Sequence, residues 1–401
     1  MNISKPFSAT LALYRNAYSG LSQSTWLLSA VMLVNRSGTM VLPFMTIYLT
    51  AMGFSLFQAG IVVGLFGAGA ICGGYLGGKL TDSWGFHRIQ LITLFGGGLL
   101  FIILGLMRSY PLICLFTFIL SLVNDAFRPA NNTAIAHYSR EENRTRSYSL
   151  NRLAINLGWA VGGTLGGFIA SFNYHLLFWI DGLTNLLAAF LLHYLLKSKP
   201  VPEPQTKMKT DATLVRSAFQ DRRYLVFIFF VILYGTCFYQ LFSTLPVYYK
   251  NHLQLSEFLI GMLMGLNGII IVVVEMVVIF RLEAKNKMMR FISTGVLLTA
   301  LSYVIFNLLP AHPATAVASV ILVTFGEMFA MPFMNTFWIS RSVPANRGQY
   351  AGLYTMAWSL AQVAGPTGGT WIAGHYGFNI LWWVTGGLCL ITSVLFRTFK
   401  G

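Results

Sequence analysis

Charged residues are scarce in this chain: only 10% of its 401 residues are Asp, Glu, Lys or Arg, whereas 56% are hydrophobic. A water-soluble protein carries about a quarter charged residues, so the composition argues against a soluble enzyme. The apolar residues form recurrent runs of about 20, each long enough to cross a ~30 Å hydrocarbon layer as a helix. The runs are continuously apolar and do not alternate, which favours helices over a β-barrel. The sequence therefore predicts an all-α membrane protein.

Motifs of catalysis and metal binding are also missing. The four cysteines have no CxxC spacing and the seven histidines have no ligand spacing, so neither a disulfide framework nor a metal site is indicated. Gly73, Gly78 and Lys79 have the spacing of a phosphate-binding loop, but Leu80 stands where a Ser or Thr must ligate magnesium. No cleavable signal peptide is evident in residues 1–23. We therefore expect no enzyme, no metal and no cofactor.

Twelve membrane spans are expected, with boundaries good to about 2–4 residues. They cover residues 25–49, 56–79, 90–107, 111–135, 150–172, 175–196, 223–249, 258–280, 291–309, 314–339, 350–373 and 377–397. Of the 27 Lys and Arg residues, all but four lie on the N-terminal side of the membrane; the exceptions are Arg108, Lys250 and the intramembrane Arg36 and Arg128. This positive-inside bias predicts cytoplasmic termini and explains the net charge of +15 without nucleic acid.

An internal repeat divides the chain into two six-helix bundles, at 1–196 and 223–401. The segment 197–222 between them is rich in proline and charge, as expected of a cytoplasmic linker. Pro43 and Pro246 are 203 residues apart, as are Pro129 and Pro332. A near-constant register across five of the six spans predicts two bundles of the same topology, related by an axis along the membrane normal. In such an architecture the substrate site lies at mid-membrane between the bundles.

The repeat, the long central loop and the stretch GGKLTDSWGFHR (77–88) resemble the major facilitator superfamily. In that family the loop between helices 2 and 3 has a Gly, an Asp and a second Gly at the spacing of Gly78, Asp82 and Gly85, followed by basic residues, here Arg88. The resemblance implies a twelve-helix transporter that works by alternating access. Asp82 and Arg88 would form a cytoplasmic latch that holds the outward-facing state; the alternative is a tight turn with solvated charges.

Charged side chains at membrane depth are costly, so they usually mark function. The candidates are Arg36, Asp125, Arg128, Asp181, Glu275 and Glu327. The resemblance implies that spans 1, 4, 7 and 10 line a central cavity, where Arg36, Arg128 and Glu327 would converge. Because a carboxyl in a half-dry cavity beside an arginine can load and release a proton, we expect Glu327 to carry the coupling proton, with Asp125 as second candidate. A structural ion pair is the alternative, and for Asp181 and Glu275 an interfacial role is favoured.

Polar and aromatic side chains on the same spans complete the predicted substrate cavity. Its members are Asn35, Arg36, Arg128, Asn132, Asn156, Tyr234, Tyr239, Gln240, Asn335 and Trp358. An aromatic cavity with few polar groups suits varied amphipathic compounds.

The sequence resembles two branches of the superfamily. Length and overall pattern resemble bacterial multidrug/proton antiporters. The stretches AINLG (154–158) and GEMFAMP (326–332) resemble proton-coupled peptide symporters instead, but those have two glutamates in span 1 where this chain has Met32 and Asn35. We therefore expect proton-driven drug efflux first and import of peptide-like or zwitterionic substrates second, with a non-transporting scaffold or receptor as a third class. The expected setting is a monomer in the bacterial cytoplasmic membrane, with a small-molecule substrate, protons and lipid as partners and no nucleic acid.

Overall fold

The computed structural model describes residues 20–140, 144–196, 217–283, 287–342 and 346–399, and this part of the chain is helical with no strand. The N-terminal half consists of α2 (Gln23–Ser37), α3 (Val41–Ala51), α4 (Leu56–Trp84), α5 (Phe86–Leu106), α6 (Tyr110–Tyr138), α7 (Arg144–Ala170) and α8 (Tyr174–Leu195). The C-terminal half consists of η3 (Ala218–Gln220), α9 (Arg222–Phe238), η4 (Tyr239–Phe242), α10 (Thr244–Asn251), α11 (Glu257–Glu283), α12 (Met288–Leu308), α13 (Pro313–Arg341), α14 (Arg347–Tyr376) and α15 (Phe378–Thr398). The predicted linker lies mostly outside the described residues.

Eleven helical segments of the described chain are long and apolar enough to span a membrane, counting α2 with α3 and α9 with α10 as one segment each. The remaining long helix, α14, has 30 residues and is less apolar, because Gln349, Gln362 and Pro366 interrupt it. It packs against α4 and α9, and Gln362 in its middle is buried between neighbouring helices, whereas Gln349 near its start is exposed. The predicted twelve-helix, two-bundle membrane fold is confirmed, with α14 as the span that hydropathy alone does not identify.

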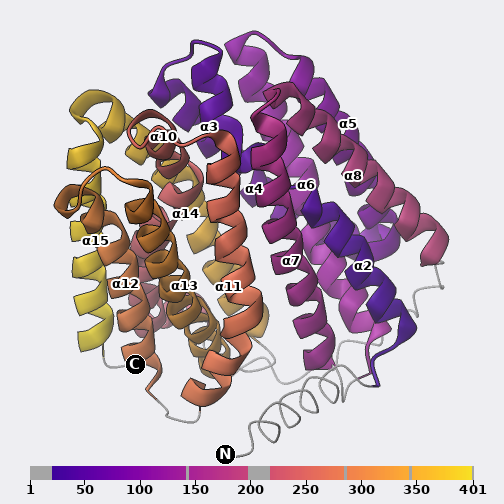
Figure 1. Cartoon of the computed structure of the whole chain (residues 1–401). Helices are drawn as coiled ribbons and strands as arrows, with labels where there is room; N and C mark the ends of the chain where they lie inside the picture. The colour runs from indigo at the N-terminus through magenta and orange to yellow at the C-terminus, as the bar shows by residue number, and fades with distance from the viewer. Residues whose placement is uncertain (1–19, 141–143, 197–216, 284–286, 343–345, 400–401) are drawn as a thin grey trace, which may run out of the picture.

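Helix boundaries reproduce the repeat that the sequence predicts. The bounds of α6 and α13 differ by 203 residues at both ends, and each helix contains the proline of the repeat, Pro129 or Pro332. The first span of each half is broken at equivalent positions, before α3 and before α10. Figure 1 shows the two halves side by side, with α2 beginning and α15 ending at the same face of the molecule. We call this face the terminal face.

The two halves approach one another most closely away from the terminal face. A Cβ atom on Gly167 of α7 would lie 2.5 Å from the Cα of Gly261 on α11, and one on Gly60 of α4 would lie 2.9 Å from the carbonyl oxygen of Pro366 on α14. All such glycine approaches between the halves, within the described residues, fall in the part of each helix remote from the terminal face. In Figure 1, α7 and α11 are close at the top and diverge toward the terminal face. The structure therefore has its halves closed at the far face.

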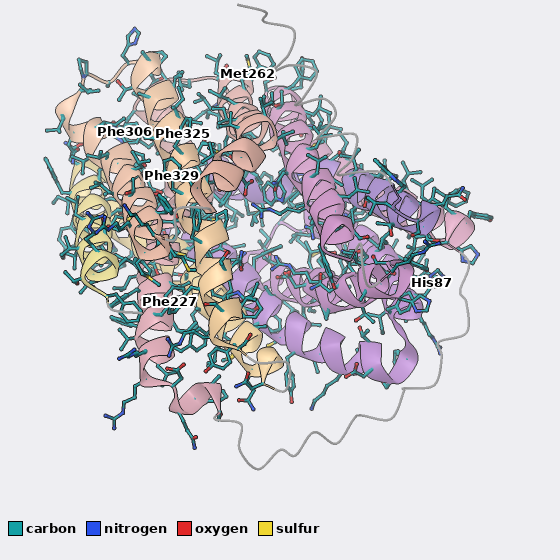
Figure 2. The ribbon with its side chains drawn as sticks, turned by 90° about the horizontal axis from the view of Figure 1, so that it is seen from below. His87, Phe227, Met262, Phe306, Phe325 and Phe329 are labelled. Atoms are coloured by element: carbon teal, nitrogen blue, oxygen red, sulfur yellow. The ribbon has the colours of Figure 1, made fainter. Side chains whose placement is uncertain are left out.

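The same separation is visible from the terminal face. In Figure 2 the C-terminal half, which carries Phe227 and Phe329, lies to the left, and the N-terminal half, which carries His87, lies to the right.

Asp181 on α8 supports the break in the first span. It is fully buried, and its carboxylate accepts hydrogen bonds from the backbone amides of Met40 (3.0 Å) and Val41 (2.9 Å). These amides open α3 and have no partner within their own helix, so a buried acceptor must satisfy them. The interfacial role favoured by the sequence does not describe this residue, because the broken helix draws the carboxylate into the core.

Gln240 stabilises the corresponding break in the first span of the C-terminal half. Its side-chain amide donates to the carbonyls of Thr236 (3.0 Å) and Gly365 (2.8 Å), and its oxygen accepts from the hydroxyl of Thr244 (2.7 Å). With every hydrogen-bonding group engaged at the break between α9 and α10, Gln240 is a structural residue in this conformation. Both halves therefore contain a polar side chain that stabilises a broken first span.

Candidate functional site

A cavity of about 370 Å³ lies between the halves and is lined mainly by the C-terminal half. We call it the aromatic cavity, because seven aromatic side chains line it: Trp159, Phe238, Tyr239, Phe242, Tyr249, Tyr354 and Trp358. Trp358 is central to this group, with its ring centroid 5.9 Å from that of Phe238 and 6.2 Å from that of Tyr239. Ring faces at these separations offer a wall to flat apolar or cationic groups.

Glu327 is the one charged side chain among the described residues that line the aromatic cavity. It follows Gly326, where a Cβ would lie 2.4 Å from the hydroxyl of Thr299 and 2.9 Å from the carbonyl oxygen of Gly295, both on α12. Residue 326 therefore faces α12, and the next residue turns toward the cavity. The Glu327 carboxylate accepts a hydrogen bond of 2.5 Å from the amide of Asn267 on α11, and this amide also donates to Thr324 at 2.9 Å. Its hydrogen-bonding partner is thus neutral.

A smaller cavity of about 230 Å³ continues from Glu327. We call it the ionic cavity, because Arg152, Glu275 and Glu327 all line it. Arg152 on α7 forms a salt bridge with Glu275 on α11, which is buried, so this ion pair joins the two halves. The sequence placed Arg152 at the cytoplasmic end of a span and favoured an interfacial role for Glu275. Neither expectation included this salt bridge, because its two partners lie in different halves of the chain.

A spacing signal could have found the ionic cavity. Arg152 and Asn156 are four residues apart on α7, and Asn267, Ile271 and Glu275 are each four apart on α11. Residues at this spacing share a helix face. All five line the aromatic or the ionic cavity, so the two helix faces, polar except for Ile271, meet across the boundary between the halves.

A third cavity, of about 140 Å³, is lined mainly by the N-terminal half, and we call it the polar cavity. Its polar lining includes Asn35, Arg36, Thr39, Thr93, Thr117, Asn124, Asp125, Arg128, Asp181, Asn185, Tyr239 and Gln362. Arg128 pairs with Asp125 at 2.6 Å, and Asp125 also accepts from Ser121 at 3.2 Å. The amide of Asn35 donates to Asn185 at 2.9 Å. Asp125 is therefore held as part of an ion pair on one helix.

Arg36, the intramembrane arginine of span 1, lies in the polar cavity. Its Nε is buried without a hydrogen-bond partner among the described residues. Gly158 of α7 lies against it, since a Cβ there would come within 2.5 Å of the Arg36 Cβ. The backbone of α7 thus fixes the position of the Arg36 stem, while its guanidinium lies with Arg128 and Asp125 in one cavity.

The expected convergence of Arg36, Arg128 and Glu327 is split in the structure. Both arginines line the polar cavity and Glu327 lines the aromatic cavity, while Trp159, Tyr239 and Phe242 line both. The other predicted cavity members divide in the same way. Asn35 lies in the polar cavity, and Asn156, Asn335 and Trp358 lie in the aromatic one; Asn132, Tyr234 and Gln240 line none of the three cavities.

The predicted latch residues lie where α4 passes into α5. Gly85 has φ of 82° and ψ of 149°, a conformation that only glycine adopts readily, and it ends α4 one residue before α5 begins. The Arg88 guanidinium lies 5.5 Å from the ring centroid of Trp84. Asp82 forms no salt bridge with any other described residue. In this conformation the loop is a tight turn, and its latch function stays a prediction.

The profile of the Major Facilitator Superfamily matches residues 25–366 and 290–400, so this chain belongs to that superfamily and is a multi-pass membrane transporter. One relative is the uncharacterized MFS-type transporter YqjV of Bacillus subtilis, 24% identical over 87% of this chain and 85% of that protein. Another is a Na(+), Li(+), K(+)/H(+) antiporter of Planococcus maritimus, 24% identical over 90% and 92%. A third is the multidrug resistance protein MdtH of Proteus mirabilis, 21% identical over 75% and 74%.

A solved structure supports the fold. The peptide transporter POT in complex with sulfate superposes with a TM-score of 0.78 and covers 95% of this chain and 94% of that one. Only 16% of the residues are identical. The similarity therefore extends to the arrangement of the helices.

Proposed function

We propose that this transporter exports amphipathic organic cations in exchange for protons. The observation that carries the proposal is the position of Glu327, the one charged residue lining the aromatic cavity among the described residues. A carboxylate among aromatic rings offers a lipophilic cation both charge neutralisation and cation–π contact. A proton neutralises the same carboxylate, so proton and cation compete for one group. Alternating exposure of this group to the two faces then couples their movements in opposite directions.

The closed far face indicates which state of the transport cycle the structure represents. If the positive-inside bias holds, the terminal face is cytoplasmic and the structure is the inward-facing state. In that state Glu327 would release its proton to the cytoplasm and take up a cation. The setting we propose is a monomer in the bacterial cytoplasmic membrane, driven by the proton gradient without a cofactor. The antiporter and multidrug names of two relatives agree with this function.

Import of a peptide-like substrate is the second candidate, and the polar cavity favours it. Arg36 and Arg128 could hold a carboxylate while Glu327 holds an amine. We rank it second because Arg128 is already paired with Asp125, and because the arginines and Glu327 line different cavities.

Reconstitution in liposomes that contain a pH-sensitive dye separates these functions. We expect ethidium to drive proton movement in the opposite direction in the wild type and in Asp125→Asn, but not in Glu327→Gln. Proton movement in the same direction as a dipeptide would replace efflux by symport. A Glu327→Gln variant with wild-type proton flux would remove Glu327 as the proton carrier.

A further inference from the structure

The ionic cavity brings three charged side chains together from three helices. Arg152 comes from α7 in the N-terminal half, and Glu275 and Glu327 come from α11 and α13 in the C-terminal half. Of the salt bridges between described residues, the one between Arg152 and Glu275 joins the halves. Glu327 lines both this cavity and the aromatic cavity. Any change of charge on Glu327 therefore occurs beside an ion pair that spans the two halves.

One guanidinium cannot serve both carboxylates equally. Its planar fork binds one carboxylate in a bidentate manner, and the second carboxylate is then left with weaker partners. In the structure Arg152 is engaged with Glu275, and Glu327 has the neutral amide of Asn267. A free Glu327 is what the proposed function requires, since a carboxylate locked by an arginine would accept neither a proton nor a cation readily.

We propose that Glu275 is a positioning residue that holds Arg152 away from Glu327 and so keeps Glu327 available to protons and substrate. Glu275 acts through Arg152 alone and does not touch the substrate. When Glu275 loses its charge, Arg152 turns to Glu327 within the same cavity and takes the place of the cation. This inference rests on the proposed function of Glu327 and adds to it the group that sets its working pH range.

The neighbours of the two carboxylates limit the groups that could produce a pH effect. Around Glu327 the charged or titratable side chains are Arg152 on α7, Glu275 on α11, and the tyrosines of neighbouring elements, Tyr234, Tyr239, Tyr249 and Tyr354. Around Glu275 they are Arg152 and Glu327. Tyrosines ordinarily titrate near pH 10 and arginines stay charged at all working pH values, so a pH effect in this cavity has to come from the carboxylates, with Arg152 as a fixed positive charge.

The test is the pH dependence of ethidium binding to the purified full chain in detergent, followed by ethidium fluorescence. Protons compete with the cation for Glu327, so affinity falls as the pH is lowered through a midpoint. We expect Glu275→Gln to move this midpoint to lower pH by about one unit and to weaken binding at neutral pH about tenfold, because Arg152 then occupies Glu327. We expect Arg152→Gln to move the midpoint in the opposite direction.

The double variant Arg152→Gln/Glu275→Gln distinguishes positioning from a merely structural role. If Glu275 acts only through Arg152, the double variant has the midpoint of Arg152→Gln within experimental error. Arg152→Lys keeps the positive charge, so we expect its ethidium-binding midpoint to lie closer to that of the wild type than to that of Arg152→Gln. This control shows that the shift in Arg152→Gln comes from the lost charge and not from a folding defect.

The failures are distinguishable. A wild type whose ethidium binding does not depend on pH overturns both the proposed function and this inference. Clear competition in the wild type, with Glu275→Gln and Arg152→Gln shifting the midpoint in the same direction or not at all, overturns the inference and leaves the proposed function standing.

Discussion

The two halves share a topology but use their intramembrane carboxylates differently. In the N-terminal half, Asp125 is paired with Arg128 and Asp181 accepts the amides that open α3. In the C-terminal half, Glu327 is bound to a neutral amide and faces an aromatic cavity. The two halves thus keep the same fold, but their carboxylates differ: those of the N-terminal half stabilise the structure, and Glu327 remains accessible to a proton or a substrate. Burial of a carboxylate therefore does not identify a functional site, and the nature of its partner is more informative.

The junction between the halves is where the largest effect is expected. A Cβ on Gly167 would meet the backbone of Gly261 and the carbonyl oxygen of Glu257, both at 2.5 Å, and backbone cannot move aside as a side-chain tip does. Gly167→Val should therefore prevent closure of the far face and abolish transport. Gly74→Val is the matched control, because nothing lies within 4 Å of a Cβ there. The transport rate of both variants is measured with a pH-sensitive dye in liposomes. Transport by Gly167→Val at the wild-type rate would contradict the close contact of α7 with α11 at the far face.

Substitutions of Asp181 and Glu327 should differ clearly in their effect on stability. Asp181→Ala leaves the amides of Met40 and Val41 without their acceptor, which should cost about 1–3 kcal/mol of stability per unsatisfied group. Glu327→Gln keeps an acceptor for Asn267 and should change stability by less than about 1 kcal/mol. Thermal unfolding in detergent, followed by circular dichroism, measures the difference. Equal melting temperatures for the two variants would remove the distinction between structural and available acids.

Much of the fold follows from local sequence properties, and much of the site does not. Span length, hydropathy and the register of Pro129 and Pro332 depend on the chain itself, so they predict two equivalent bundles. The partner of Arg152 depends on how α7 and α11 meet, and no local property of either helix encodes it. Likewise, that Arg36 and Glu327 line different cavities depends on how the helices pack, and no local property of span 1 or span 10 encodes it.

Asp221, at the start of α9, is a third kind of acid and should give a smaller, pH-dependent effect. Burial alone raises the pKa of Asp221, but hydrogen bonds from Arg341 (2.9 and 3.0 Å), the amide of Tyr224 (3.1 Å) and the hydroxyl of Tyr350 (3.0 Å) outweigh it, so its pKa lies below the usual value. A pKa lowered by folding stabilises the protein above the unfolded pKa of about 3.9 and loses this contribution as the pH falls through the folded value.

Asp221→Asn should accordingly lower the melting temperature at pH 7, by an amount equivalent to about 1 kcal/mol or less, since Arg341 is partly exposed. The gap between the variant and the wild type should narrow as the pH is taken below 4. A difference in melting temperature that widens toward acid pH would contradict a lowered pKa of Asp221 in the folded protein. Melting curves across this pH range provide the measurement.

Asn132 should show the smallest effect of all. It is exposed and lines none of the three cavities, and its backbone carbonyl, which the mutation retains, accepts the hydroxyl of Tyr148 at 2.9 Å. Asn132→Ala should leave the ethidium transport rate within about twofold of the wild type. Asn156→Ala, at a position that lines both the aromatic and ionic cavities, is the comparison variant and should reduce the rate more.

Proton release on substrate binding tests the central claim most directly. When ethidium is added to the purified protein in weakly buffered detergent near the binding midpoint, a pH electrode should record release of up to about one proton for each cation bound, because both compete for one carboxyl group. Asp125→Asn should release protons as the wild type does, and Glu327→Gln should release none. Undiminished release from Glu327→Gln would contradict the assignment of Glu327 as the group shared by proton and substrate.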